Sequence, residues 1–112
     1  MSAEYDLTII GGGPVGMFAA FYAGMRNARV QLLESLPELG GQVQALYPEK
    51  IIHDVAGYPA IKGRELVAQL EKQLTQFPID IQLASPVTDV TGAMGDFTIT
   101  TASGQQSHSK AI

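Results

Sequence analysis

The chain has 112 residues and a formal net charge of −4, a length that suits one domain or part of one. Hydrophobic residues make up 46% and charged residues 16%, which excludes a solvated disordered chain and favours strands buried on both faces. The acidic charge excludes nucleic acid and anionic membrane partners, and the lack of cysteine excludes a disulfide or a thiolate metal site. No apolar run reaches the roughly 20 residues of a membrane span, so we expect a cytoplasmic protein.

The first 34 residues predict a βαβ unit. Residues 7–10 form a short apolar run typical of a strand, and glycine ends it. From Pro14 to about Arg26 the composition favours a helix, with proline in the first turn, where its missing N–H is not needed. Residues 30–34 predict a second strand that ends on an acid. We therefore expect two parallel strands joined by a helix.

The middle of the chain changes from an irregular segment to a helix. Residues 35–63 have no regular period and contain seven glycines and prolines, so we expect a long functional loop there. Residues 64–77 return to helical spacing, with apolar residues on one face and polar ones opposite. Pro78 stops this helix, which we expect to cover the sheet.

The last third predicts short strands joined by turns. The apolar runs 79–83, 87–91 and 97–101 are separated by glycine-containing turns and predict an antiparallel meander. Residues 107–112 begin a further strand. The predicted fold class is α/β, with a Rossmann-like βαβ unit and parallel sheet plus a small antiparallel β-meander, in an incomplete domain.

A glycine turn follows the first predicted strand and opens the first helix. Gly11, Gly13 and Gly16 match the pattern G-x-G-x-x-G. The first glycine makes the tight turn, the second allows the backbone to approach a pyrophosphate, and the third allows close packing of helix and strand. The helix start then offers free N–H groups and a positive dipole to phosphates. The motif alone also occurs without a nucleotide.

Glu34 strengthens the nucleotide interpretation. It ends the second predicted strand about 20 residues after the glycine turn, where a carboxylate can accept both ribose hydroxyls of an adenosine. The same carboxylate repels a 2′-phosphate, so the residues favour FAD or NAD over NADP. The alternatives are a solvated strand end at Glu34 and a non-catalytic nucleotide-binding module.

A longer stretch carries a family resemblance. The segment ESLPELGGQVQALYPEKIIHDVAGYP, residues 34–59, resembles the FAD-binding segment of thioredoxin-reductase-like flavoproteins. It is most similar to their ferredoxin/flavodoxin–NADP reductases, through residues 45–50 and 54–57. Glutathione-reductase-type enzymes differ, because they place two redox cysteines soon after the Gly-Gly pair, where this chain has none.

The resemblance implies FAD as the cofactor and assigns roles to individual residues. The glycine turn would hold the pyrophosphate, Glu34 the ribose, and Val87 the adenine through its backbone. Gln42 and Tyr47 match family positions that contact FAD beyond the ribose, and Asp54 matches one near the isoalloxazine. The implied contacts are Gly11, Gly13, Pro14, Val15, Gly16, Glu34, Gly41, Gln42, Tyr47, Asp54 and Val87.

Three of these positions have simpler structural interpretations if the family resemblance is set aside. Tyr47 could be a loop anchor, Gln42 a surface amide and Val87 a core residue. His53 is read as structural, and we expect no catalytic residue and no metal site in the chain.

The resemblance also implies the rest of the protein. Residues 1–112 would be the N-terminal part of an FAD-binding domain, without the NADP-binding domain and the C-terminal part of the FAD domain. The full-length enzyme would transfer hydride from NADPH to FAD and then single electrons to ferredoxin or flavodoxin, as a homodimer. Thioredoxin reductase or a related FAD-dependent reductase is the alternative. The 112-residue piece alone is expected to be inactive and to retain FAD weakly or not at all.

Overall fold

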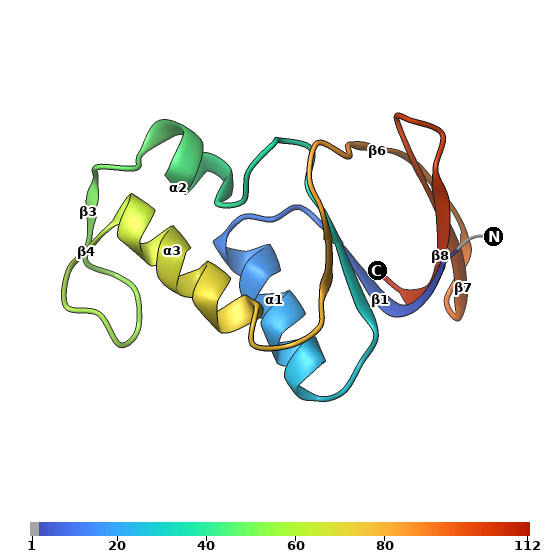
Figure 1. Cartoon of the computed structure of the whole chain (residues 1–112), viewed down its shortest axis with the longest axis horizontal. Helices are drawn as coiled ribbons and strands as arrows, with labels where there is room; N and C mark the ends of the chain where they lie inside the picture. The colour runs from blue at the N-terminus through green and yellow to red at the C-terminus, as the bar shows by residue number, and fades with distance from the viewer. Residues whose placement is uncertain (1–2) are drawn as a thin grey trace.

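A computed structural model describes residues 3–112 (Figure 1). In chain order the elements are β1 (Ala3–Ile10), α1 (Pro14–Met25), β2 (Val30–Leu33), α2 (Gly41–Leu46), β3 (Ile51–Ile52), β4 (Ile61–Lys62), α3 (Gly63–Leu74), β5 (Asp80–Gln82), β6 (Val87–Ala93), β7 (Asp96–Thr101) and β8 (Gln106–Ala111). The longest helices have 12 residues. No helix within residues 3–112 is long and apolar enough to cross a membrane.

The predicted βαβ unit is confirmed. Strands β1 and β2 pair in parallel, with Leu7 opposite Val30 and Ile10 opposite Leu33. Helix α1 begins at Pro14, as predicted, and ends one residue before Arg26. Strand β1 starts earlier than its apolar run, because its first half pairs with β8. The unit places the glycine turn at the carboxyl end of β1, beside the end of β2.

The predicted place of residues 79–83 in the meander is wrong. Strand β5 pairs in parallel with β2, with Leu32 opposite Ile81, and lies at the edge of the sheet. The physical reason is α3, which connects β2 to β5. A helical crossover returns the chain in the direction of the preceding strand, so the two strands become parallel neighbours.

The meander consists instead of β6, β7 and β8. Strand β7 pairs antiparallel with both β6 and β8, which confirms the predicted strands near 87–91 and 97–101 and the further strand near 107–112. Strand β8 also pairs in parallel with β1. All six strands therefore form one sheet in the order β5-β2-β1-β8-β7-β6, so the predicted parallel strands and antiparallel meander are parts of the same sheet.

The segment 35–63 has more structure than the predicted loop. It contains α2 and the antiparallel pair β3–β4. Both are too short to give a recognisable period in the sequence. Gly40 and Gly41, at the start of α2, have φ of 116° and 57°, which favours glycine at both positions.

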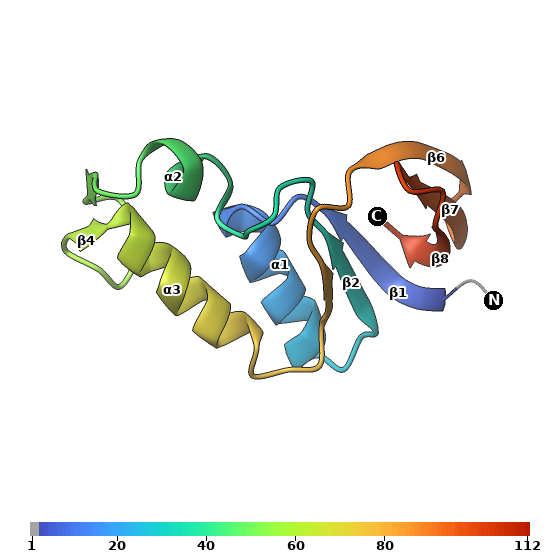
Figure 2. The ribbon, with the colours of Figure 1, turned by 45° about the horizontal axis from the view of Figure 1, so that its top comes forward.

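The helices cover one face of the parallel strands. Figure 2 shows α3 and α1 on one side of β2 and β1, with β6–β8 at the opposite end of the molecule. The hydrophobic core lies between β2 and the two helices. Its buried members are Met17, Ala20, Val30, Leu32, Leu39, Val67 and Leu74.

Polar side chains join strands of the six-stranded sheet. The side-chain amide of Gln31 donates to the hydroxyls of Thr8, at 3.1 Å, and Ser107, at 2.7 Å, and all three residues are buried. The Tyr5 hydroxyl donates to the Asp80 carboxylate and so connects β1 to β5. Burial and this hydrogen bond raise the pKa of Tyr5 to about 12. These bonds satisfy polar groups that would otherwise be costly to bury.

Candidate nucleotide site at the glycine turn

The turn between β1 and α1 requires two of its glycines for its own geometry. Gly11 has a φ of 108°, in the left-handed region that favours glycine. A Cβ atom at Gly16 would overlap the backbone carbonyl of Gly11. The first and third glycines of the motif are therefore required by the chain's own backbone.

Gly13 differs from these two glycines. Its φ is −72°, which any residue can adopt. A Cβ atom there would come no closer than 3.9 Å to its nearest neighbour, the Cα of Gly41. The fold thus leaves open the space that a side chain at position 13 would fill. Glycine at this position allows a ligand to approach the backbone closely, as a pyrophosphate does in this motif.

Backbone donors are available around this space. Within the described chain, no acceptor pairs with the N–H groups of Gly13, Val15 or Gly16. The first helical bond of this turn runs from the N–H of Met17 to the carbonyl of Gly13, at 2.9 Å. Unpaired N–H groups and the helix dipole make such a helix start favourable for an anion.

Glu34 lies directly after β2 and faces the glycine turn. It is only 5% exposed, which rules out a solvated strand end. One carboxylate oxygen accepts the N–H of Gly12 at 2.7 Å. The other accepts the N–H of Leu36 at 2.7 Å and the hydroxyl of Ser35 at 3.2 Å. The acid is thus fixed between the turn and the segment that follows β2.

These contacts keep Glu34 ionised. Burial raises its pKa, but the hydrogen bonds from Leu36, Gly12 and Ser35 outweigh that effect, so the pKa lies below its usual value. A carboxylate has about four acceptor positions, and the protein fills three of them. The remaining capacity suits a ribose hydroxyl, whereas the negative charge opposes a 2′-phosphate.

Two backbone hydrogen bonds bring the start of β6 toward Glu34. The N–H of Glu34 donates to the backbone carbonyl of Gln82 at 2.9 Å, and the N–H of Ser85 donates to the backbone carbonyl of Glu34 at 2.8 Å. Val87 follows two residues later, half-buried at the first position of β6. The structure thus places Val87 on the segment beside the acid.

The Gly-Gly pair also reaches the glycine turn. A Cβ atom at Gly41 would lie 3.1 Å from the Cα of Gly13. Gln42, the next residue, is exposed on α2. Sequence reasoning missed two further residues here, Gly12 and Gly40. The unbroken run of glycines at 11–13 was the available signal for Gly12.

Tyr47 and Asp54 meet in a separate hollow. Both are exposed, and they line a hollow of about 380 Å³ together with Lys50. The Lys50 ammonium lies 5.5 Å from the centre of the Tyr47 ring, within range of a cation–π contact. His53 lines the same hollow, and its ring nitrogen Nδ1 is 3.3 Å from the carbonyl of Pro59.

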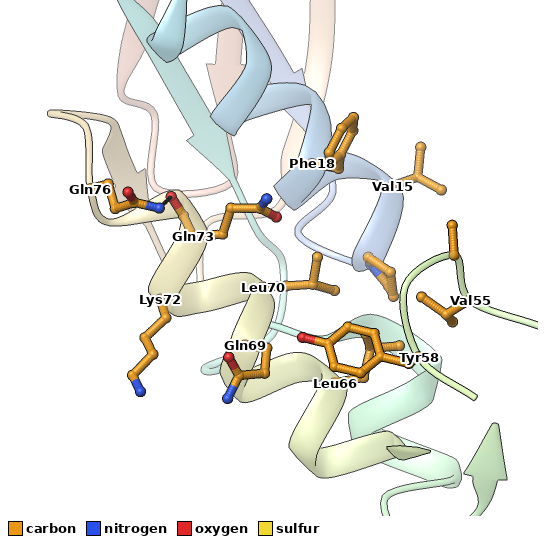
Figure 3. Close-up of a pocket in the computed structure, with 12 residues that line it drawn as sticks. Val15, Phe18, Val55, Tyr58, Leu66, Gln69, Leu70, Lys72, Gln73 and Gln76 are labelled. Atoms are coloured by element: carbon orange, nitrogen blue, oxygen red, sulfur yellow. Dashed lines mark hydrogen bonds between the residues drawn. The ribbon is translucent and has the colours of Figure 1, made fainter. Parts of the chain in front are cut away.

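A larger hollow of about 920 Å³ lies between α1, α3 and residues 55–58. Pro14 and Val15 line it, but Glu34 does not. Figure 3 shows Val15 and Phe18 on α1 and Leu66 and Leu70 on α3 among the residues that line it. The hollow is mostly apolar, with Gln69, Lys72, Gln73 and Gln76 as polar lining residues, and neither Glu34 nor Val87 lines it.

Comparison with known proteins assigns the family. The model of the family "FAD dependent oxidoreductase" matches residues 6–101, and the chain belongs to that family. A curated ferredoxin–NADP reductase of Levilactobacillus brevis is 64% identical over 104 residues, covering 93% of this chain and 31% of that protein. One of Leuconostoc mesenteroides is 53% identical over the whole chain and 33% of its own length. These relatives confirm the resemblance found in the sequence.

Solved structures confirm the fold. The thioredoxin reductase of Streptococcus pyogenes matches with a TM-score of 0.83 and 29% identity, over 98% of this chain and 34% of that one. The thioredoxin reductase of T. acidophilum matches with a TM-score of 0.82 and 26% identity, over 97% of this chain and 34% of that one. The chain thus spans about a third of the length of the relatives it matches.

Proposed function

We propose that this chain is the FAD-binding portion of a ferredoxin/flavodoxin–NADP reductase. Residues 1–112 form the N-terminal part of the FAD domain, and the NADP-binding domain and the C-terminal part of the FAD domain belong to the longer polypeptide. The support is the identity of 53% and 64% to proteins named ferredoxin–NADP reductase, of which the chain matches about a third.

The space at Gly13 is the observation that carries the cofactor proposal. The fold leaves room there for a Cβ atom, and the neighbouring N–H groups of Val15 and Gly16 have no acceptor within residues 3–112. The buried carboxylate of Glu34 adjoins the same turn. Donors for a pyrophosphate and an acceptor for a ribose therefore lie together, as the adenosine diphosphate half of FAD requires.

The described residues fit successive parts of FAD. Gly11, Gly13, Pro14, Val15 and Gly16 would hold the pyrophosphate. Glu34 would hold the ribose, and the backbone of Val87 would meet the adenine. Gly41 would be a further FAD contact, Gln42 and Tyr47 would contact FAD beyond the ribose, and Asp54 would lie near the isoalloxazine.

The chemistry of the reaction belongs to the cofactor. When bound, FAD can accept a hydride from NADPH and pass on electrons one at a time. We assign this chain the tasks of binding and orienting FAD. No side chain among residues 3–112 is given the role of a nucleophile or a general acid.

The partners and location are proposals for the complete protein. NADPH is the hydride donor, ferredoxin or flavodoxin is the acceptor, and the protein is a homodimer in the cytoplasm. The names of the relatives support ferredoxin and NADP. Analytical ultracentrifugation of the complete gene product tests the dimer, with a single monomeric species as the contrary result.

The proposed function is tested with the complete gene product. Its visible spectrum should show bound flavin, and NADPH should support reduction of ferredoxin but not of thioredoxin. Reduction of thioredoxin alone would contradict the proposal. The 112-residue chain alone should show no reductase activity and should lose FAD during gel filtration. Stoichiometric yellow flavin after gel filtration would contradict that part.

Thioredoxin reductase is the second candidate. The fold similarity to the enzymes of S. pyogenes and T. acidophilum, with TM-scores of 0.83 and 0.82, favours it. The identity to these structures, 29% and 26%, is lower than that to the ferredoxin–NADP reductases. A C-x-x-C pair beside a second glycine motif, in the part of the gene that follows these residues, would favour the second candidate.

A further inference from the structure

We propose that Gly12 is a positioning residue of the phosphate site. Its peptide groups are held from two sides, by the Glu34 carboxylate and by the backbone of Gly40. The acid assigned to the ribose would then also fix the shape of the glycine turn. This inference rests on the proposed FAD site, and it concerns a position that the motif G-x-G-x-x-G leaves variable.

The first contact holds the N–H of Gly12. It donates to the Oε1 atom of Glu34 at 2.7 Å, and both residues are buried. Hydrogen bonds to an ionised acceptor are about twice as strong as neutral ones. The other oxygen, Oε2, is fixed by the N–H of Leu36 at 2.7 Å, so the carboxylate cannot turn away without losing that bond.

The second contact holds the carbonyl of Gly12. It accepts the N–H of Gly40 at 2.9 Å. Gly40 has a φ of 116°, and a Cβ atom there would lie 3.0 Å from the side chain of Val67. Gly40 therefore has its own reason to be glycine. The turn is thus tied to the segment before α2 as well as to the end of β2.

Close packing explains why position 12 is glycine. A Cβ atom there would lie 2.5 Å from the Leu39 side chain and 3.3 Å from the Glu34 carboxylate. A side chain at 12 would therefore displace the Leu39 side chain and crowd the acid that holds its own N–H. At Gly13 the nearest atom would be 3.9 Å away. Position 12 serves the shape of the turn, whereas position 13 leaves room for the ligand.

The consequence for the cofactor is a preformed phosphate site. With Gly12 held, the unpaired N–H groups that follow it keep one arrangement before any ligand arrives. Because the loop is already ordered, ligand binding then loses less free energy to ordering it. Removing the Glu34 charge should therefore loosen the turn even when no ribose is present.

The test uses the complete gene product with FAD removed. Hydrogen–deuterium exchange at single-amide resolution measures the N–H of Gly12 in the wild type and in Glu34→Gln. We expect exchange at Gly12 at least ten-fold faster in Glu34→Gln. Glu38→Gln is the matched control, because Glu38 is an exposed acid in the same segment, and exchange at Gly12 should not change. Glutamine keeps one acceptor oxygen, so Glu34→Leu, which has none, is measured beside it. Unchanged exchange at Gly12 in both variants would overturn the inference.

A measurement on the wild type covers the case in which Glu34→Gln does not fold. In the FAD-free wild-type protein, the N–H of Gly12 should exchange at least ten-fold more slowly than that of Gly13, which has no acceptor within residues 3–112. Equal rates would overturn the inference. These experiments contain no FAD, so their failure is distinct from failure of the proposed function, which is judged by whether the wild type binds FAD.

Discussion

The two halves of the proposed FAD site differ in how firmly the chain holds them. On the adenosine side, Gly12 and Glu34 are buried and joined by a 2.7 Å hydrogen bond. On the flavin side, Gln42, Tyr47 and Asp54 are exposed, and Tyr47 retains 49% of its accessible surface. The adenosine half is thus formed by the fold itself, whereas the flavin half consists of side chains on a segment with little burial.

This difference separates two kinds of residue. Substitutions of residues whose contacts hold the turn, such as Gly16 and Glu34, should change the free energy of unfolding as well as FAD binding. Gly13 is the exception on this side, because the fold leaves space beside it. Substitutions in the flavin half should change the bound flavin and leave the unfolding free energy nearly unchanged. The following variants, all in the complete gene product, test this division in order of decreasing effect.

Gly16→Ala should have the largest effect. The added methyl group would overlap the carbonyl of Gly11, and both partners are backbone, so the turn must move. We expect a loss of about 1–3 kcal/mol of unfolding free energy, the usual cost of overpacking, together with loss of FAD binding. Urea unfolding of the FAD-free protein measures the first effect. A urea midpoint equal to that of the wild type would contradict the close packing of Gly16 against Gly11.

Gly13→Ala is the counterpart of that variant. The chain has room for its methyl group, with 3.9 Å to the nearest atom. We expect the unfolding free energy to fall by no more than about 1 kcal/mol, the cost of placing the less favourable alanine at the N-cap of α1. The FAD dissociation constant should nevertheless rise more than ten-fold, because the methyl group occupies the space assigned to the pyrophosphate. If Gly13→Ala binds FAD with wild-type affinity, the pyrophosphate does not lie at this position.

The free energy of unfolding should depend on pH through the ionisation of Glu34. Its folded pKa lies below the ordinary value of 4.5, so its stabilising contribution is present above that pH and is lost as the pH falls through the folded pKa. Urea unfolding between pH 3 and 7 should show a smaller decrease toward acid in Glu34→Gln than in the wild type. Parallel curves would mean that the ionised carboxylate does not stabilise the fold.

Tyr47→Leu should have the smallest effect on stability. It removes the ring beside Lys50, and an exposed cation–π contact contributes about 0.5–1 kcal/mol. The visible spectrum or the affinity of the bound flavin should change, whereas the thermal midpoint of the FAD-free protein should move little. An unchanged flavin spectrum and affinity would support the simpler reading of Tyr47 as a loop anchor.

The sequence predicted the parts of the fold that depend on local pattern. Pro14 and the apolar run before Gly11 placed β1, the turn and α1, and the spacing to Glu34 placed the acid at the end of β2. The strands of the meander were also found, because glycine-containing turns separate them. The pairing of β5 was predicted wrongly, although the helix at residues 64–77, between two strands, was a crossover signal for its parallel pairing.

The remaining features depend on contacts between distant residues. The bond from Gly12 to Glu34 spans 22 residues, and the bond from Gly40 to Gly12 spans a similar distance. No local pattern specifies such pairs. Helix α2 and strands β3 and β4 were missed because each has six residues or fewer, too short for a period to be visible.

A crystal structure of the complete gene product with FAD tests the central claim most directly. The account predicts pyrophosphate oxygens within hydrogen-bond distance of the N–H groups of Gly13, Val15 or Gly16, and a ribose hydroxyl on Glu34. It also predicts that the bond between Gly12 and Glu34 persists. FAD seated in the hollow between α1 and α3, with no phosphate at the glycine turn, would contradict it.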